Sequence, residues 1–93
     1  MAMTRAADTA PARALLLPMV IEANDDGFLA RAPGIQGAFA EGDTIEDAVF
    51  NCVDVIKMIA AYRAERGESP LAGSIDVTPE TQLAISMAIE MPA

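Results

Sequence analysis

The first half of the chain carries three short apolar runs separated by turn sequences. Runs of this length between Gly, Pro, Asn and Asp residues are typical of β-strands. They predict strands at about Leu16 to Glu22, Phe28 to Ala32 and Gln36 to Ala40. Because the intervening turns are short, we expect the three strands to pair as an antiparallel meander.

Turn-forming residues separate these strands at fixed places. Residues 24–27 have the sequence Asn-Asp-Asp-Gly, in which the polar side chains support a hairpin turn and the glycine allows positive φ. Pro33 ends the second strand because proline donates no hydrogen bond to a ladder. Gly37 marks the next turn, and Gly42 with Asp43 is expected to turn the chain into a helix.

A long helix is predicted from about Ile45 to Arg66. Thr44 is a suitable N-cap, Asp47 is spaced to return a capping-box bond, and Glu46 places negative charge in the first turn. Gly67 is suited to the C-terminal cap. Apolar residues recur at three- and four-residue spacing at Ile45, Ala48, Val49, Cys52, Val53, Ile56, Ile59 and Ala60.

The apolar face of this helix is wider than one small sheet needs. Phe50, Met58 and Tyr62 extend it beyond the main stripe. We therefore expect these three side chains, together with the acidic turn residues Asp25 and Asp26, to be available for a partner protein.

The segments after the helix are less regular. Glu68 to Thr78 is predicted to be a loop, because it contains proline and glycine. From Thr81 to Met91, apolar residues alternate with small or polar ones, which favours a strand, although Thr78-Pro79-Glu80 is also a helix start. The predicted fold is α+β, in the order β-β-β-α-β, with one helix on a mostly antiparallel sheet. Residues 1–14 are predicted to be a disordered tail, and residues 15–93 a single domain.

Composition narrows the choice of partners. The 93 residues are 53% hydrophobic, which is high for a domain too small to bury most of its surface, so we expect a homo-oligomer, either a dimer or a tetramer. The formal net charge of −8 argues against binding the phosphate backbone of a nucleic acid and suits a basic protein partner.

Few residues are suited to catalysis. The chain has no histidine and a single cysteine, Cys52, which falls on the apolar face of the predicted helix as a small hydrophobe. The acidic residues near the turns suggest a magnesium site only weakly, because each has a local role in a turn or a helix start. We expect no enzyme activity, metal or cofactor. The apolar run at residues 15–21 is too short to span a membrane, so a cytoplasmic protein is expected.

The order of several motifs resembles the HicB-like antitoxin family. The resemblance rests on Val20-Ile21-Glu22, Asp26-Gly27-Phe28, Ala30, Pro33, Ile35 and Gly37, followed by Gly42-Asp43-Thr44-Ile45-Glu46-Asp47-Ala48 at the helix start. It covers about Leu17 to Arg66 in specific motifs. The motif residues Gly27, Phe28, Pro33, Gly37, Gly42, Asp43, Thr44, Glu46 and Ala48 are interpreted as structural.

The resemblance implies a partial RNase H-like fold and an antitoxin that binds and blocks a small basic HicA-type, mRNA-cleaving toxin. Many members continue into a DNA-binding segment, for which this chain leaves no room before Ala93. Ala38 stands where the family often has cysteine. Two other hypotheses are an oligomeric scaffold or small-ligand-binding protein without a toxin, and a metal-dependent nuclease.

Overall fold

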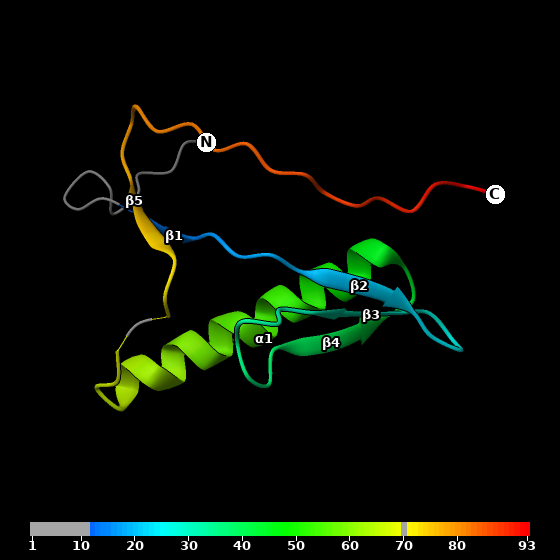
Figure 1. Cartoon of the computed structure of the whole chain (residues 1–93), viewed down its shortest axis with the longest axis horizontal. Helices are drawn as coiled ribbons and strands as arrows, with labels where there is room; N and C mark the ends of the chain where they lie inside the picture. The colour runs from blue at the N-terminus through cyan, green and yellow to red at the C-terminus, as the bar shows by residue number, and fades with distance from the viewer. Residues whose placement is uncertain (1–11, 70) are drawn as a thin grey trace, which may run out of the picture. The chain divides into compact units, whose positions relative to one another are not determined.

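The computed structural model describes residues 12–69 and 71–93, which form two compact units. One unit contains residues 17–69 and 86–93, and the other contains residues 12–16 and 71–85. The elements are β1 (Ala12–Leu15), β2 (Val20–Ala23), β3 (Phe28–Arg31), β4 (Phe39–Gly42), α1 (Ile45–Glu65) and β5 (Ser74–Val77) (Figure 1). This order confirms the predicted α+β arrangement, with a meander, one long helix and a strand after the helix.

Strands β2, β3 and β4 form the predicted antiparallel meander, although the first of them begins at Val20 and not at Leu16 as predicted. Ala30 lies at its centre, paired with Ile21 on β2 and with Ala40 on β4. The first hairpin closes where Asn24 donates its backbone N–H to the carbonyl of Gly27 at 2.9 Å. The turn predicted at residues 24–27 is therefore confirmed.

The third strand begins later than predicted, at Phe39 instead of Gln36. Its preceding residues form a compact turn in which Ala32 donates to the Ala38 carbonyl at 2.9 Å and Ile35 donates to the Ala32 carbonyl at 3.0 Å. Gly37 completes this turn with a φ of 84°, a conformation that favours glycine. Because these bonds engage the backbone of residues 32–38, the ladder with β3 starts only beyond them.

Both ends of α1 follow the sequence signals. The Thr44 hydroxyl accepts a hydrogen bond from the Asp47 N–H at 3.0 Å, which satisfies one free donor of the first turn. Beyond the last turn, Gly67 has a φ of 69°, and Glu68 donates to the Arg63 carbonyl at 2.9 Å. The predicted helix is confirmed to within one residue at its end.

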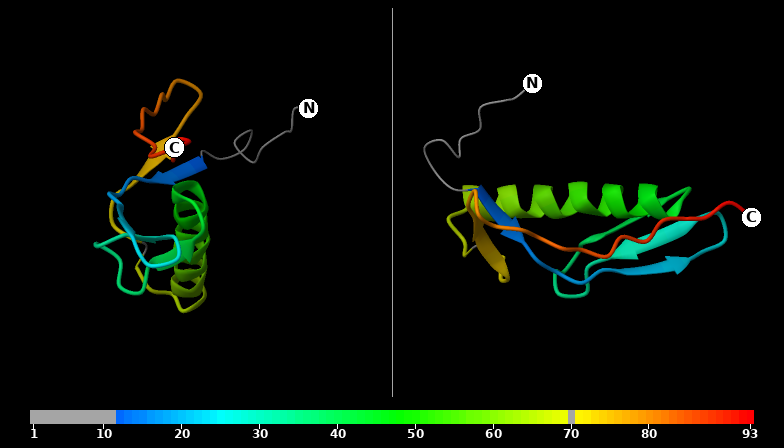
Figure 2. Two further views of the ribbon diagram at one scale, coloured as in Figure 1. Left: turned by 90° about the vertical axis from the view of Figure 1, so that its right-hand side faces the viewer. Right: turned by 90° about the horizontal axis from the view of Figure 1, so that it is seen from above.

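The core lies between α1 and one face of the meander (Figure 2). Its members are mostly small, so the helix approaches the sheet closely. The buried hydrophobic residues are Ala30, Ala32, Ala38, Ala48, Val49, Cys52 and Ile56. Cys52 is the largest of the fully buried side chains. A core of this kind leaves most of the larger apolar side chains outside it.

The other unit contains a two-stranded antiparallel sheet that the sequence did not predict. Strand β1 pairs with β5, and the Arg13 guanidinium contacts the carboxylate of Asp76 at 3.2 Å and donates to the Ser74 hydroxyl at 2.8 Å. Residues 12–14 of the predicted tail therefore lie in a strand, and the predicted loop at Glu68 to Thr78 contains another. The remainder of the predicted tail, residues 1–11, is outside the described residues.

The strand predicted from Thr81 to Met91 is absent. Residues 81–93 form neither strand nor helix. Thr81 donates to the Thr78 carbonyl at 2.9 Å, and its hydroxyl accepts from the Thr78 N–H at 2.9 Å, so the helix-start sequence closes a single turn that does not continue. Apolar residues do alternate with small or polar ones in this segment, but an alternating segment becomes a strand only when another strand pairs with it.

Candidate functional site

Four carboxylates gather at one end of the meander. Asp25 and Asp26 lie in the turn between β2 and β3, whereas Glu41 and Asp43 lie at the end of β4, and all four are exposed. The Asn24 side chain links the two groups, because its amide donates to the Glu41 carboxylate at 3.3 Å. We call Asp25, Asp26, Glu41 and Asp43 the acidic edge.

Two shallow, open depressions lie along the acidic edge. One is lined by Asn24, Asp26, Gly27, Glu41, Gly42 and Asp43, and the other by Asn24, Asp25, Asp26 and Glu41. No lysine or arginine belongs to either lining. Adjacent carboxylates without basic neighbours give this surface a negative potential, which attracts a basic partner. The depressions are too open to enclose a small ligand.

Side-chain and backbone bonds fix the turn that carries Asp25 and Asp26. The Asn24 side-chain oxygen accepts from the N–H of Asp26 at 3.2 Å and from the N–H of Gly27 at 2.8 Å. Such an Asx turn holds the backbone without using either aspartate carboxylate. Both carboxylates are therefore free to face solvent or a partner.

The two glycines beneath the acidic edge are positions of close backbone approach. A Cβ on Gly27 would overlap the carbonyl oxygen of Gly42, and a Cβ on Gly42 would overlap the backbone N of Ala48 at the start of α1. These contacts join the first hairpin, β4 and the helix. They support the interpretation of Gly27, Gly42 and Ala48 as structural residues.

The sheet face opposite the helix is uncovered within this unit. Alternation along the three strands places Val20, Glu22, Leu29, Arg31, Phe39 and Glu41 on it. Phe39 lies opposite Arg31 and is 59% exposed, although it is one of the largest apolar side chains in the chain. Glu41 belongs both to this face and to the acidic edge, so an exposed aromatic ring lies on the same strand as the carboxylates.

Phe39 and Glu41 were not predicted to bind a partner. The sequence of β4, Phe-Ala-Glu-Gly, alternates large and small residues, which indicates that Phe39 and Glu41 share one face of the strand. Which of the two alternating faces meets the helix depends on the start of the strand, and a change of register by one residue exchanges the faces. The predicted strand at Gln36 to Ala40 ended before Glu41, so the sequence alone did not place these residues together.

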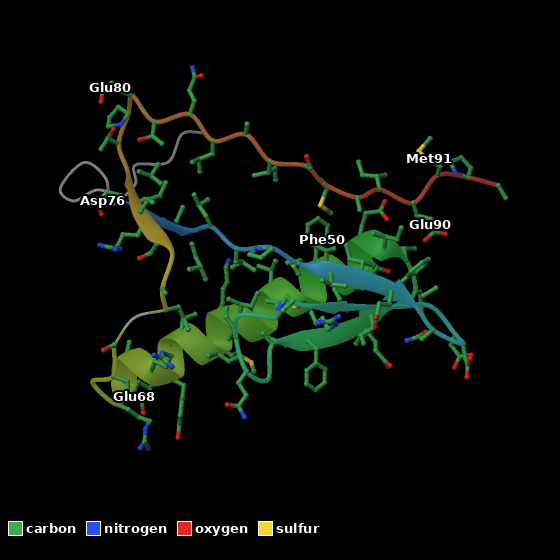
Figure 3. All side chains as sticks on the ribbon, in the orientation of Figure 1. Phe50, Glu68, Asp76, Glu80, Glu90 and Met91 are labelled. Atoms are coloured by element: carbon green, nitrogen blue, oxygen red, sulfur yellow. The ribbon has the colours of Figure 1, made fainter. Side chains whose placement is uncertain are left out.

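The helical residues predicted to meet a partner are exposed, and none of them lines the depressions of the acidic edge. Phe50, Met58 and Tyr62 are 59%, 66% and 57% exposed, and Figure 3 labels Phe50 on α1. Tyr62 has a neighbour just beyond the end of α1, because the Arg66 guanidinium lies 5.3 Å from the centre of its ring. This cation–π contact occupies part of the tyrosine surface.

Cys52 is enclosed between the helix and the sheet. It is fully buried, and its Sγ lies 3.7 Å from the Ala38 carbonyl oxygen. Burial raises the pKa of the Cys52 thiol above its ordinary value, because the low-polarity surroundings disfavour the thiolate. The thiol therefore remains protonated at neutral pH and acts as a small apolar group.

We expect Cys52 to resist alkylation in the folded protein. The thiol should react with iodoacetamide at neutral pH only after denaturation, because it is neither exposed nor ionised in the native state. Since its folded-state pKa is raised, its contribution to stability is complete at neutral pH and is lost as pH rises through that folded-state value. Mass spectrometry of native and urea-treated samples measures the difference, and rapid native labelling would contradict a buried thiol.

Within the described chain, no three His, Cys, Asp or Glu residues are placed to hold a metal ion together. The carboxylates of the acidic edge are thus adjacent without converging on one point. In residues 12–69 and 71–93, no helix has the length and apolar character needed to span a bilayer.

Comparisons with known proteins give one partial match. The chain is 36% identical over 42 residues to an uncharacterized 14.9 kDa protein of the rep-hol intergenic region in Haemophilus phage HP1. The match covers 45% of this chain and 32% of the phage protein, so the chain spans less than half the length of that relative. No protein-family model and no solved structure matches the chain.

Proposed function

We propose that this protein is a HicB-like antitoxin that binds and inhibits a small, basic, mRNA-cleaving toxin of the HicA type. It would act in the cytoplasm as a homo-oligomer, without enzyme activity or a nucleic-acid-binding role of its own. The observation that carries the proposal is the acidic edge, because its carboxylates suit a basic protein surface. The ordered motifs from Val20 to Ala48 provide the resemblance that points to this class of partner.

The charge distribution supports a protein partner better than a nucleic acid. The acidic edge adds local negative potential to a chain whose net charge is already −8. A toxin that cleaves mRNA needs a basic surface to bind the phosphate backbone. An acidic inhibitor that covers this surface gains attraction during approach and excludes the RNA by occupying the same site.

The uncovered sheet face supplies the apolar part of such an interface. Phe39 offers an aromatic anchor, and aromatic residues contribute disproportionately to protein–protein binding. Leu29 and Arg31 on β3 extend this face beside it, with Glu41 on β4. In this arrangement the ring is buried on binding, and the carboxylates of the acidic edge form the charged rim.

The proposal is tested by co-expressing the full chain with the small basic protein encoded by the adjacent reading frame. We expect that protein to arrest growth alone and to co-purify with this chain, which should restore growth and suppress RNA cleavage in vitro. If no small basic protein is encoded nearby, or if it does not co-purify, the antitoxin proposal is wrong. An oligomeric protein without a toxin would then account for the chain.

Neutralising carboxylates of the acidic edge should lower the affinity of the proposed complex with the basic toxin, because the two proteins associate more slowly. The double substitution Asp26→Asn/Asp43→Asn removes two carboxylates and is expected to slow association roughly tenfold at low salt. The difference should shrink as salt rises, because exposed charges are screened. Stopped-flow or surface plasmon resonance measures the rates.

A matched control variant distinguishes the effect of charge at the acidic edge on the association rate from the effect of the net charge of the chain. Asp54→Asn/Glu65→Gln changes the net charge equally at exposed positions of α1, away from the acidic edge. We expect it to leave the association rate nearly unchanged. Equal slowing by both double variants would mean that the acidic edge is not the contact surface.

A further inference from the structure

The segment of residues 86–93 belongs to the meander unit and forms neither strand nor helix, and its backbone is almost unpaired. Among residues 12–69 and 71–93, no backbone–backbone hydrogen bond involves residues 82–93. Two hydrogen bonds attach the segment to the start of α1: Ile45 donates its N–H to the Glu90 carboxylate at 3.4 Å, and Glu90 donates its N–H to the Glu46 carboxylate at 3.3 Å. A carboxylate at the start of a helix is favoured by the helix dipole.

This attachment sets which side of the segment faces outward. Figure 3 shows Glu90 directed toward the start of α1 and Met91 directed to the other side. Alternation then places Met87, Ile89 and Met91 in one row away from Glu90. In this row Leu83, Ile85, Ile89 and Met91 are 48%, 79%, 59% and 75% exposed, whereas Met87 is half-buried. The apolar row is thus largely uncovered on both sides of Met87.

We infer that this row is covered by a second copy of the chain, through antiparallel pairing of residues 83–91 with the same residues of that copy. The inference specifies the oligomer included in the proposed function and does not depend on the toxin. Identical segments related by a two-fold axis form a self-complementary interface. Pairing also supplies hydrogen-bond partners to backbone groups that lack them within one chain.

Charge and length indicate that the apolar row is covered by residues 83–91 of a second copy, and not by a basic partner or by an edge strand of the meander. Glu90 is the single ionisable side chain between residues 81 and 93, so the net charge of −8 does not oppose self-association here. For the same reason the row offers nothing to a basic partner. The edge strands β2 and β4 have four residues each and carry Glu22 and Glu41, so a nine-residue segment would extend beyond either of them.

Geometry selects one register. Directly opposed residues of an antiparallel pair share a face, so members of the apolar row must oppose one another. Centring the pair on Met87 opposes Ile85 to Ile89 and uses the whole alternating segment, which Pro92 terminates. In this register Glu90 opposes Ala84, and the two copies of Glu90 stay apart.

The oligomeric state of the purified full chain tests the inference without any toxin. We expect sedimentation equilibrium at micromolar concentration to give twice the 9.7 kDa chain mass for the wild type. Ile89→Glu should return the mass to 9.7 kDa, because it places a charge in the row. Ser86→Glu introduces the same charge on the other side of the segment and should remain dimeric. Circular dichroism confirms that each variant is folded.

Cross-linking tests the register. Met87→Cys would lie opposite its own copy, with Cβ atoms about 5 Å apart, and should form a disulfide-linked dimer under mild oxidation. Ile85→Cys residues would be roughly 14 Å apart along the strands and should not cross-link. Cys52 stays in place because it is buried. A monomeric wild type, a dimer that survives Ile89→Glu, or equal cross-linking of the two cysteine variants would overturn the inference.

Discussion

Replacing Gly42 with alanine is expected to lower the free energy of unfolding by about 3 kcal/mol, which is a large part of the stability of a small domain. The added Cβ would overlap the backbone N of Ala48, and it would lie 2.6 Å from the Asp47 carbonyl carbon and 2.8 Å from the Ala48 Cα. These are backbone atoms in the first turn of α1, so no side-chain rotation relieves the overlap. Either the helix start or the end of β4 must move.

Urea denaturation of Gly42→Ala and the wild type at equal protein concentration measures this loss. Equal concentration matters, because association contributes to the apparent stability of an oligomer. Gly34→Ala is the matched control, since a Cβ there meets nothing within 4 Å and the residue does not have positive φ. We expect Gly34→Ala to be neutral or slightly stabilising. A Gly42→Ala protein as stable as Gly34→Ala would show that the close approach does not constrain the fold.

Ile56→Ala is expected to lower the free energy of unfolding by about 2 to 4 kcal/mol. Ile56 is 7% exposed, and it is the largest side chain among the buried hydrophobic residues. Alanine would remove buried methyl groups and leave a cavity that rigid neighbours cannot fill completely. The surrounding core consists mostly of alanines, which have no side-chain torsions to adjust. The site is therefore poorly able to collapse.

Met58→Ala provides the control for Ile56→Ala on the same helix. Met58 is 66% exposed, so its truncation removes a side chain of similar size without opening a cavity. Thermal unfolding should show a melting temperature lowered by more than about 8 °C for Ile56→Ala. Met58→Ala should remain close to the wild type. Similar losses in both variants would contradict the assignment of Ile56 to the core and Met58 to the surface.

The stability losses expected for Gly42→Ala and Ile56→Ala identify residues that maintain the fold. They differ from the residues proposed to bind a partner protein. Gly42 and Ala48 belong to the ordered motifs from Val20 to Ala48, and their contacts are backbone contacts between β4 and α1. Substituting them should impair folding and reduce binding only as a consequence. Asp26, Phe39 and Asp43 are exposed, so substituting them should affect binding while leaving stability nearly intact.

Signals that act within a few residues predicted much of the meander unit. The turn at residues 24–27 and the cap at Thr44 depend on hydrogen bonds between near neighbours, and the sequence contains both partners. The buried position of Cys52 followed from helical period alone. The start of β4 was less predictable, because the competing turn at residues 32–38 is closed by backbone bonds that carry little sequence signal.

Local propensity and spacing are enough to predict the order of the meander and helix, the two ends of the helix and the polar residues of the first turn. They do not predict which distant segments meet, because that depends on packing between them. Tertiary contacts pair β1 with β5, for example Arg13 with Asp76, which is 63 positions away. They also bring the acidic edge together from the turn at Asp25 and Asp26 and the end of β4, and they leave Phe39 exposed. The same contacts leave the alternating segment at residues 81–91 without a strand partner, because periodicity specifies the faces of a strand but cannot specify what pairs with it.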